Sequence, residues 1–354
     1  MKERILRIRE ILNEGEAALI TSDICITYLT GFPHSEGYVL ITEKSCNLLV
    51  DFRYIEAAEK SVSSMSVLSF TNAFEKINEL LEEAGAKSVV IENEAVTLSA
   101  FESYKKEIKA EIIADNKLSK LLADMRIVKT APEIEKLKKA QKIAEEAYLE
   151  VLNFVKVGIT EKEIAARLEY LMKLKGAEKV AFDLITVTGK KTSLPHGVPS
   201  DNKVQDGDFI TFDIGAVYDS YHSDMTRTVA IGNVSDKQRE IYDIVLKAHL
   251  KGLSAVKAGV SGFDVDKVSR DVIREAGYGE YFGHSTGHGV GLEIHEPPYA
   301  SMKSKDILKE GMTLTVEPGI YLPDEFGVRI EDTVLVTKEG FETFASMPKE
   351  LIIL

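Results

Sequence analysis

Two glutamates lie within apolar, strand-like runs near the C-terminus of this sequence, and they constrain its fold more than any other feature. Glu317 ends the run 312–317, and Glu331 lies inside the run 328–336. Burying an ionised carboxylate is costly unless another charge compensates it. Arg329 is a candidate partner for one of them. A fold of this chain therefore has to bring further positive charge to these two strands.

The C-terminal two-thirds of the sequence alternates helix-start signals with strand-like runs. Thr130 and Thr160 each precede a glutamate by three residues, which is the spacing of a capping box, and Pro132 falls in the first turn of the first helix. The predicted helices span 131–155, 161–175, 236–258 and 263–276, and the predicted strands span 183–188, 209–216, 223–231, 312–317 and 328–336. We predict helices packed against a largely antiparallel sheet.

The N-terminal third has a different pattern, typical of a small α/β arrangement. A helix leads into strand 17–21, and residues 24–30 read as extended because of their β-branched side chains. The following strands and helices alternate up to residue 124. Because 354 residues exceed the usual size of one hydrophobic core, two domains are expected. We place them at 1–125, with an α/β fold, and 126–354, which makes the whole chain α+β.

Composition limits the classes of partner. A net charge of −13 and a pI near 5.2 disfavour nucleic acid and anionic membranes, since both require basic patches. The first residues lack the apolar core of a signal peptide, and no apolar run is long enough to span a bilayer. Cys25 and Cys46 have no metal-ligand spacing and read as reduced thiols. These features predict a cytoplasmic protein.

Histidines are concentrated between residues 284 and 295. Three of the seven in the chain, His284, His288 and His295, fall within these twelve residues and are separated by glycines. Histidine binds metals and titrates near neutral pH, so the cluster indicates a metal or proton-transfer site, with a loop of incidental histidines as the alternative. The odd step from His288 to His295 would put the two side chains on opposite faces of a regular strand. We therefore expect a bend or bulge at Gly289 or Gly291.

Two aspartates stand where a hairpin could pair them. If the turn is centred between Tyr218 and Asp219, Asp213 lies directly opposite Asp224, and cross-strand partners have Cβ atoms about 5 Å apart. Such carboxylates repel each other unless a proton or a metal neutralises them. The alternatives are a solvated hairpin face, or a longer loop that changes the register.

Together these segments supply four carboxylates and one imidazole. Oxygen-rich sets of this kind suit borderline-hard divalent ions such as manganese or cobalt. The five residues are Asp213, Asp224, His288, Glu317 and Glu331.

The same residues stand in the order and context of the dinuclear metallopeptidases with the pita-bread fold, the group that holds methionine aminopeptidase, aminopeptidase P and prolidase. The segments that resemble the Xaa-Pro branch are Leu194-Pro-His-Gly, Phe212-Asp-Ile-Gly-Ala, Ser223-Asp-Met-Thr-Arg-Thr, Gly287-His-Gly-Val-Gly-Leu-Glu-Ile-His-Glu, Val316-Glu-Pro-Gly-Ile-Tyr and Arg329-Ile-Glu-Asp. Tyr28-Leu-Thr-Gly-Phe and Asp51-Phe-Arg-Tyr resemble the N-terminal domain of that branch. The resemblance therefore covers nearly the whole chain.

The resemblance implies that two divalent metal ions bind to the five residues. Manganese is the first expectation, with cobalt, zinc or iron as alternatives, and a water or hydroxide between the ions would attack the peptide carbonyl. Asp224 and Glu331 would bridge both ions. Glu317 would also act as the general base.

The remaining site residues follow from the same resemblance. His284 and His295 would bind substrate and stabilise the tetrahedral intermediate, and Arg329 would orient the carboxylate ligands. His196 and Phe182 would line a pocket for the proline ring, with Tyr321 as a further candidate at the site. His222 has no implied role.

The implied reaction is removal of an N-terminal residue from before proline, and the implied assembly is a homodimer. Strict dipeptidases of this group tend to carry an arginine just after the motif histidine, and here His295 is followed by Glu-Pro-Pro-Tyr299. This departure favours an Xaa-Pro aminopeptidase over the alternative, an Xaa-Pro dipeptidase (prolidase). A metal-free creatinase-like hydrolase and a non-catalytic binding module share the fold, but both would have lost the ligand set that is intact here.

Overall fold

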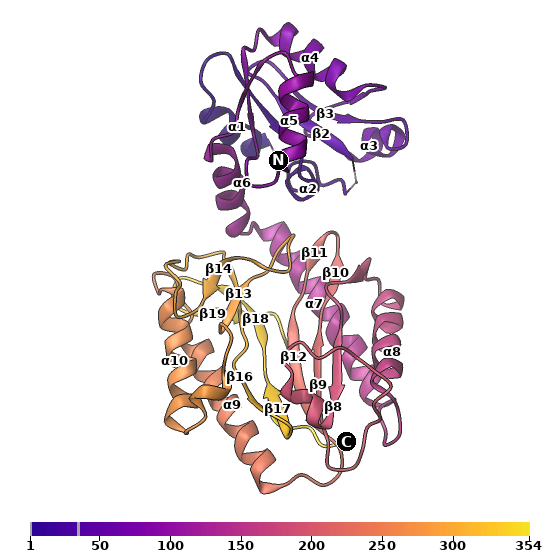
Figure 1. The fold of residues 1–354 in the computed structure, drawn as a ribbon, viewed down its shortest axis with the longest axis vertical. Coiled ribbons are helices and arrows are strands. Elements are labelled where there is room, and N and C mark those ends of the chain that lie inside the picture. The colour runs from indigo at the N-terminus through magenta and orange to yellow at the C-terminus, as the bar shows by residue number, and fades with distance from the viewer. Residues whose placement is uncertain (1, 34–35) are drawn as a thin grey trace. The chain divides into compact units, whose positions relative to one another are not determined.

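The structure is a computed structural model that describes residues 2–33 and 36–354. The chain divides into two compact units, one ending at Arg126 and one running from Ile127 to Leu354. Figure 1 shows both units, and each is described by itself below. Among the described residues, no helix combines the length and apolarity needed to cross a bilayer.

The N-terminal unit contains one six-stranded sheet with the order β4-β3-β2-β1-β5-β6. Antiparallel pairs β1–β2 and β2–β3 lie between parallel pairs at both edges. The strands are β1 (Glu16–Ile20), β2 (Gly37–Ile41), β3 (Cys46–Val50), β4 (Ser66–Ser69), β5 (Ser88–Ile91) and β6 (Glu111–Ile113). The helices are α1 (Lys2–Glu10), α2 (Asp23–Thr30), α3 (Ile55–Ser61), α4 (Ala73–Ala84), α5 (Leu98–Glu107) and α6 (Lys117–Ile127).

Residues 24–30 are helical, so the prediction of an extended segment there is wrong. The side chain of Ser22 accepts a hydrogen bond from the amide of Cys25 at the start of α2. Gly31 ends the helix in the left-handed region, with φ of 72°. These two caps satisfy backbone groups at both ends of the short helix, and they outweigh the weak preference of β-branched residues for strands.

The C-terminal unit combines four long helices with short strands, all of whose pairs are antiparallel, as predicted. The helices are α7 (Ala131–Leu152), α8 (Glu161–Leu174), α9 (Asp236–Ala255) and α10 (Gly262–Glu275), with 3-10 turns η1 (Gly189–Ser193) and η2 (Gly279–Tyr281). The strands are β7 (Lys179–Val180), β8 (Ile185–Thr188), β9 (Phe209–Ile214), β10 (Ala216–Tyr218), β11 (Tyr221–His222), β12 (Met225–Ala230), β13 (Gly287–Gly289), β14 (Glu296–Ala300), β15 (Thr313–Val316), β16 (Gly319–Leu322), β17 (Phe326–Arg329), β18 (Asp332–Val336) and β19 (Phe341–Thr343).

The helices of this unit cover the outer sides of its sheets, and the strands lie between them (Figure 1). Helices α7 and α8 share one buried apolar cluster with β9 and β12, in which Tyr148 meets Phe212 edge to face at 5.4 Å. Helices α9 and α10 share another with β16 and β17, built around Tyr242 and Val328. With their outer faces packed in this way, the strands can turn polar side chains toward each other at the centre of the unit.

The hairpin that carries the two aspartates has a different register from the predicted one. Tyr218 pairs with Tyr221, and the turn residues Asp219 and Ser220 both have positive φ, 47° and 69°. The turn is therefore centred one residue later than expected, and Asp213 lies opposite Thr226. A two-residue turn with positive φ at both positions matches the twist of the flanking strands. The residue opposite Asp213 is thus two positions beyond Asp224. Because side chains two residues apart lie on the same face of a strand, Asp224 still faces Asp213, as a diagonal neighbour.

A buried carboxylate anchors the loop 195–200. Glu161, at the start of α8, is fully buried, and it accepts hydrogen bonds from Ser200 through both the amide and the hydroxyl group, each at 2.8 Å. Lys191 bonds the same oxygen at 2.8 Å, and the Thr188 amide bonds the other at 2.9 Å. Burial raises the pKa of Glu161, but these donors outweigh that effect and hold it below its usual value.

We expect Glu161→Gln to lower the free energy of unfolding by about 2–3 kcal/mol, because it removes the charge that Lys191 and Ser200 surround. Urea denaturation of the two proteins measures the difference. Glu163→Gln is the matched control on the same helix: Glu163 is exposed and fills a capping box, which glutamine also fills. Equal urea midpoints for Glu161→Gln and Glu163→Gln would contradict the role of Glu161 in holding the loop 195–200.

Candidate functional site

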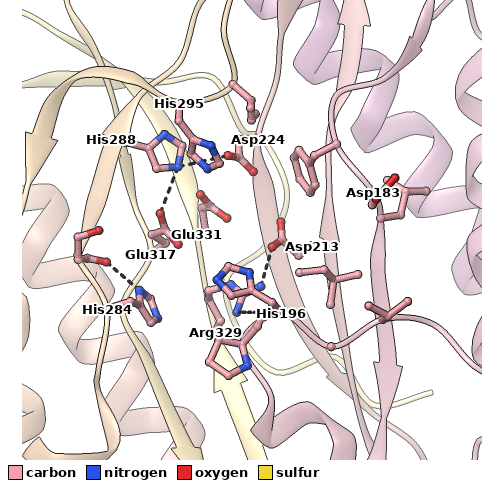
Figure 2. Close-up of a pocket in the computed structure, with 18 of the residues that line it drawn as sticks. Asp183, His196, Asp213, Asp224, His284, His288, His295, Glu317, Arg329 and Glu331 are labelled. Carbon is pink, nitrogen blue, oxygen red and sulfur yellow. Dashed lines mark hydrogen bonds and ion pairs between the residues drawn. The ribbon is translucent and has the colours of Figure 1, made fainter.

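A cavity of about 560 Å³ opens among the strands of the C-terminal unit, and all five predicted metal ligands line it. Figure 2 shows Asp213 on one side of the cavity and Asp224, His288, Glu317 and Glu331 gathered across from it. Apolar side chains form much of the remaining wall: Phe182, Leu184, Ile185, Pro195, Val198, Pro199 and Ile294. The site thus combines a set of ionisable side chains with apolar walls, as in many small-molecule sites.

Strand ends and irregularities present these side chains. Asp224 directly precedes β12, Glu317 follows β15, and Glu331 lies in the break between β17 and β18. The register of β13 and β14 shifts between His288 and Gly289, which confirms the predicted bulge. His295 lies in the loop that precedes β14, and its ring centroid is 4.4 Å from that of His288.

The imidazole of His288 defines the centre of the polar group. Its Nδ1 lies 3.0 Å from the carbonyl oxygen of Gly289, so Nδ1 carries the proton and donates it there. Burial lowers the pKa of His288 to about 4, which keeps the ring neutral at pH 7. Its Nε2 lone pair then faces Glu317 Oε1 at 3.4 Å and Asp224 Oδ2 at 3.6 Å. A lone pair that faces carboxylate oxygens is unfavourable unless a proton or a cation lies between them.

The carboxylates show the same need for positive charge. Burial raises the pKa of Asp224 and of Glu331 well above the usual value, and the nearby carboxylates raise both further. Burial also raises the pKa of Glu317, to about 8. Within the described part of the chain, Asp213 Oδ1 is buried with no hydrogen-bond partner.

A metal ion would satisfy these groups together. Ligand atoms of Asp224, His288 and Glu331 lie within 4.8 Å of one another, and Glu317 is adjacent through its contact with His288. Carboxylate oxygens with a single imidazole are the donors preferred by borderline-hard divalent cations. The residues present therefore fit a divalent metal.

A chain of polar contacts crosses the floor of the cavity from Asp213 to His284. Arg329 bonds Asp213 Oδ2 through Nη2 at 2.6 Å and donates to the hydroxyl of Tyr321 through Nη1 at 2.9 Å. That hydroxyl lies 2.9 Å from Nε2 of His284, whose Nδ1 lies 2.8 Å from the Ser285 carbonyl. Nδ1 therefore carries the proton, and Tyr321 donates to Nε2. Burial lowers the pKa of His284 to about 4 and raises that of Tyr321 to about 12, which suits this arrangement at pH 7.

The other predicted site residues differ in how they meet the cavity. His196, His295 and Phe182 line it, and both histidines are exposed to solvent. Tyr321 is buried beneath His284 and is not among the lining residues, so it does not reach the cavity as a substrate contact would. The reason is that its hydroxyl is fixed between Arg329 and His284.

Two threonines that were not predicted as site residues hold the carboxylates. Thr226 donates to Glu331 Oε2 at 2.7 Å and accepts from Arg329 Nε at 3.1 Å. Thr315 donates to Glu317 Oε1 at 3.2 Å and accepts from the His288 amide at 3.0 Å. The signal was available, because Thr226 is two residues from Asp224 and Thr315 two residues from Glu317, and such pairs share one face of a strand. Asp183, which lines the opposite wall in Figure 2, was also missed.

Comparison with known proteins extends these observations. Residues 135–338 match metallopeptidase family M24, and residues 4–128 match the creatinase/prolidase N-terminal domain. An Xaa-Pro dipeptidase from Pyrococcus horikoshii is 42% identical over 99% of both chains, and an uncharacterized peptidase of Bacillus subtilis is 41% identical over 96% of both.

Solved structures show the same relationship. The Xaa-Pro dipeptidase from Bacillus anthracis superposes with a TM-score of 0.95 at 42% identity, covering 99% of each chain. An X-Pro aminopeptidase from Thermotoga maritima superposes with a TM-score of 0.91 at 39% identity, covering 99% of this chain and all of that one. The mixed helices and sheets of this chain therefore have the fold of solved Xaa-Pro peptidases.

At pH 7, addition of a divalent metal to the metal-free protein should release protons. The raised pKa values of Asp224, Glu331 and Glu317 keep these carboxyl groups partly protonated, and a cation displaces those protons, so affinity should rise as the pH rises toward 8. Calorimetric titration in two buffers with different ionisation enthalpies counts the protons. Equal binding enthalpies in both buffers would mean that the site is already deprotonated.

Proposed function

Because the chain belongs to metallopeptidase family M24, we propose that it is a metal-dependent peptidase that cleaves the bond between an N-terminal residue and proline. The observation that carries the proposal is the neutral His288 imidazole, whose Nε2 lone pair faces Asp224 and Glu317 inside the cavity. A packing role alone would not gather several buried carboxyl groups around a ring nitrogen that has no proton to donate to them. Chemistry that uses a bound cation would.

Two divalent metal ions would be held by Asp213, Asp224, His288, Glu317 and Glu331. Manganese suits this set best, with cobalt, zinc or iron as alternatives, since oxygens dominate and only one nitrogen takes part. Bound cations of this kind supply a nucleophilic water at neutral pH and polarise the scissile carbonyl. Arg329, which is paired with Asp213 and bonded to Thr226, would orient the ligands.

Substrate contacts come from the groups around the metal ligands. Glu317 is the proposed general base, because its carboxylate stands at the edge of the cavity beside His288. His284 and His295 would bind the peptide and stabilise the oxyanion that forms on its carbonyl. Phe182 and His196 would receive the proline ring, which has no N–H to donate and is therefore suited to an apolar wall.

The cavity favours an aminopeptidase over a dipeptidase. Among the described residues that line it, Arg329 is the only lysine or arginine, and it is 4% exposed and already paired with Asp213. A dipeptide ending in proline would place its free carboxylate in this pocket without a cationic partner. Peptides that continue beyond proline avoid that cost. The dipeptidase remains the second candidate, since relatives from Pyrococcus horikoshii and Pyrococcus furiosus bear that name.

We also propose a cytoplasmic homodimer. The reduced state expected in the cytoplasm agrees with Cys25 and Cys46, which are both free thiols. The homodimer rests on the resemblance to the Xaa-Pro peptidases. Sedimentation of the purified protein measures the oligomeric state.

A paired peptide assay tests the substrate. With manganese present, we expect cleavage of Ala-Pro-Ala with a kcat/KM at least about tenfold above that of Ala-Pro, since an unpaired carboxylate in the pocket costs on the order of 1 kcal/mol or more. Mass spectrometry follows both products, and Ala-Ala-Ala is the control without proline. Preference for Ala-Pro would replace the aminopeptidase by the dipeptidase, and failure to cleave either would reject the proposed function.

Glu317→Gln should reduce kcat by at least about 100-fold, because the amide neither accepts a proton nor holds a cation as well as the carboxylate. Kinetics and metal analysis of the purified variant measure both effects. Glu310→Gln, at an exposed site on the same unit, is the control and should match the wild type. A Glu317→Gln variant with wild-type kcat would remove Glu317 from the mechanism.

A further inference from the structure

Helix α10 carries a buried ion pair outside the cavity that none of the roles above uses. Asp266 is fully buried, and Arg270, one turn later, binds both of its oxygens at 2.8 Å through Nε and Nη2. Such a two-point pair has a fixed geometry, because the guanidinium plane matches the carboxylate. Neither residue lines the cavity.

This pair binds the main chain of the segment that carries His284. Arg270 donates to the carbonyl oxygens of Phe282 at 2.8 Å and His284 at 2.7 Å. Asp266 Oδ1 accepts from the amide of Thr286 at 3.0 Å and from its hydroxyl at 2.9 Å. Three alternate residues are thus held by one ion pair.

The contacts continue into the polar side of the cavity. The carbonyl oxygen of Thr286 accepts a hydrogen bond from the amide of Glu317 at 2.8 Å. The guanidinium of Arg270 stacks 4.2 Å above the Phe282 ring, and that ring meets the His284 imidazole edge to face at 5.0 Å. Both His284 and Glu317 therefore depend on the same helix for their placement.

We propose that Asp266 and Arg270 are positioning residues for the active site, which set the places of His284 and Glu317 through the 282–286 main chain. The proposal rests on the proposed peptidase function for its catalytic consequence. Displacement of a reacting group by about 1 Å can cost on the order of 100-fold in rate, so loss of the pair should act mainly on kcat.

The test compares Arg270→Met, Arg270→Lys and Asp266→Asn with wild type under saturating manganese and Ala-Pro-Ala. We expect Arg270→Met and Asp266→Asn to lower kcat by about 10–100-fold, with KM changed by less than about threefold. Arg270→Lys should recover part of the loss, since it keeps the charge but not the two-point geometry. Measurements at temperatures well below the unfolding midpoint of every variant keep folding out of the comparison.

Two variants of the same helix are matched controls. Lys267→Met removes an exposed pair with Asp271 that has the same spacing, and Ser269→Ala removes a buried hydrogen bond to the Ala248 carbonyl at 3.1 Å. Ser269→Ala should lower the unfolding midpoint without lowering kcat. If it lowers kcat as much as Arg270→Met does, or if Arg270→Met retains wild-type kcat, the proposal fails.

Amide hydrogen exchange supplies a readout that needs no activity. In the purified protein, Arg270→Met should speed exchange in peptides that cover 282–288 and 315–319 by about tenfold or more, and Ser269→Ala should leave them unchanged. Unchanged exchange in Arg270→Met would show that the ion pair does not hold the 282–286 segment. If wild-type protein cleaves no peptide, the function proposed above is wrong, and exchange still decides whether Asp266 and Arg270 hold this segment.

Discussion

Repulsion among buried carboxylates around one neutral imidazole is the constraint on which this structure depends. Asp224, Glu317 and Glu331 share a small volume beside His288, and burial together with mutual repulsion raises their pKa values. The positive charge nearby is that of Arg329, which already forms an ion pair with Asp213. A bound cation completes the arrangement, so folding and metal affinity are linked through the same few groups.

The surrounding fold supplies the rigidity that such a site needs. The ligands lie in or directly beside antiparallel strands. Thr226, two residues from Asp224, hydrogen-bonds Glu331, and Thr315 hydrogen-bonds Glu317, which lies two residues further along the chain. Helices cover the outer faces, so that the polar groups point inward. The buried Glu161 fixes the loop that bears His196, and the α10 ion pair binds the segment that bears His284. Charged groups outside the cavity thus determine its shape.

Much of this could be predicted from the sequence, because local signals were strong where backbone caps or strand periodicity determine structure. The capping boxes at Thr130 and Thr160 form as expected, and the bulge beside His288 follows from the odd spacing of its histidines. The predicted hairpin register was wrong by one residue in the turn. Asp219 and Ser220 adopt positive φ there, and no glycine marks the turn in the sequence. The caps of α2 outweighed strand propensity. The spacing of Asp266 and Arg270 fits an ion pair on one face of the predicted helix, but their bonds to the 282–286 main chain could not be predicted, since those groups are distant along the chain.

The hairpin between β9 and β12 has a consequence for how this chain can vary. Its turn lies one residue beyond the predicted place, yet Asp213 and Asp224 still face the same cavity, because the resulting offset is two residues. Side chains alternate between the faces of a strand, so parity rather than length decides which residues meet. Residues inserted between Tyr218 and Tyr221, at the tip of the hairpin, would leave Asp213 and Asp224 facing the cavity whatever the length of the insertion. A single-residue insertion between Asp213 and the paired tip would turn one aspartate away and disable the site.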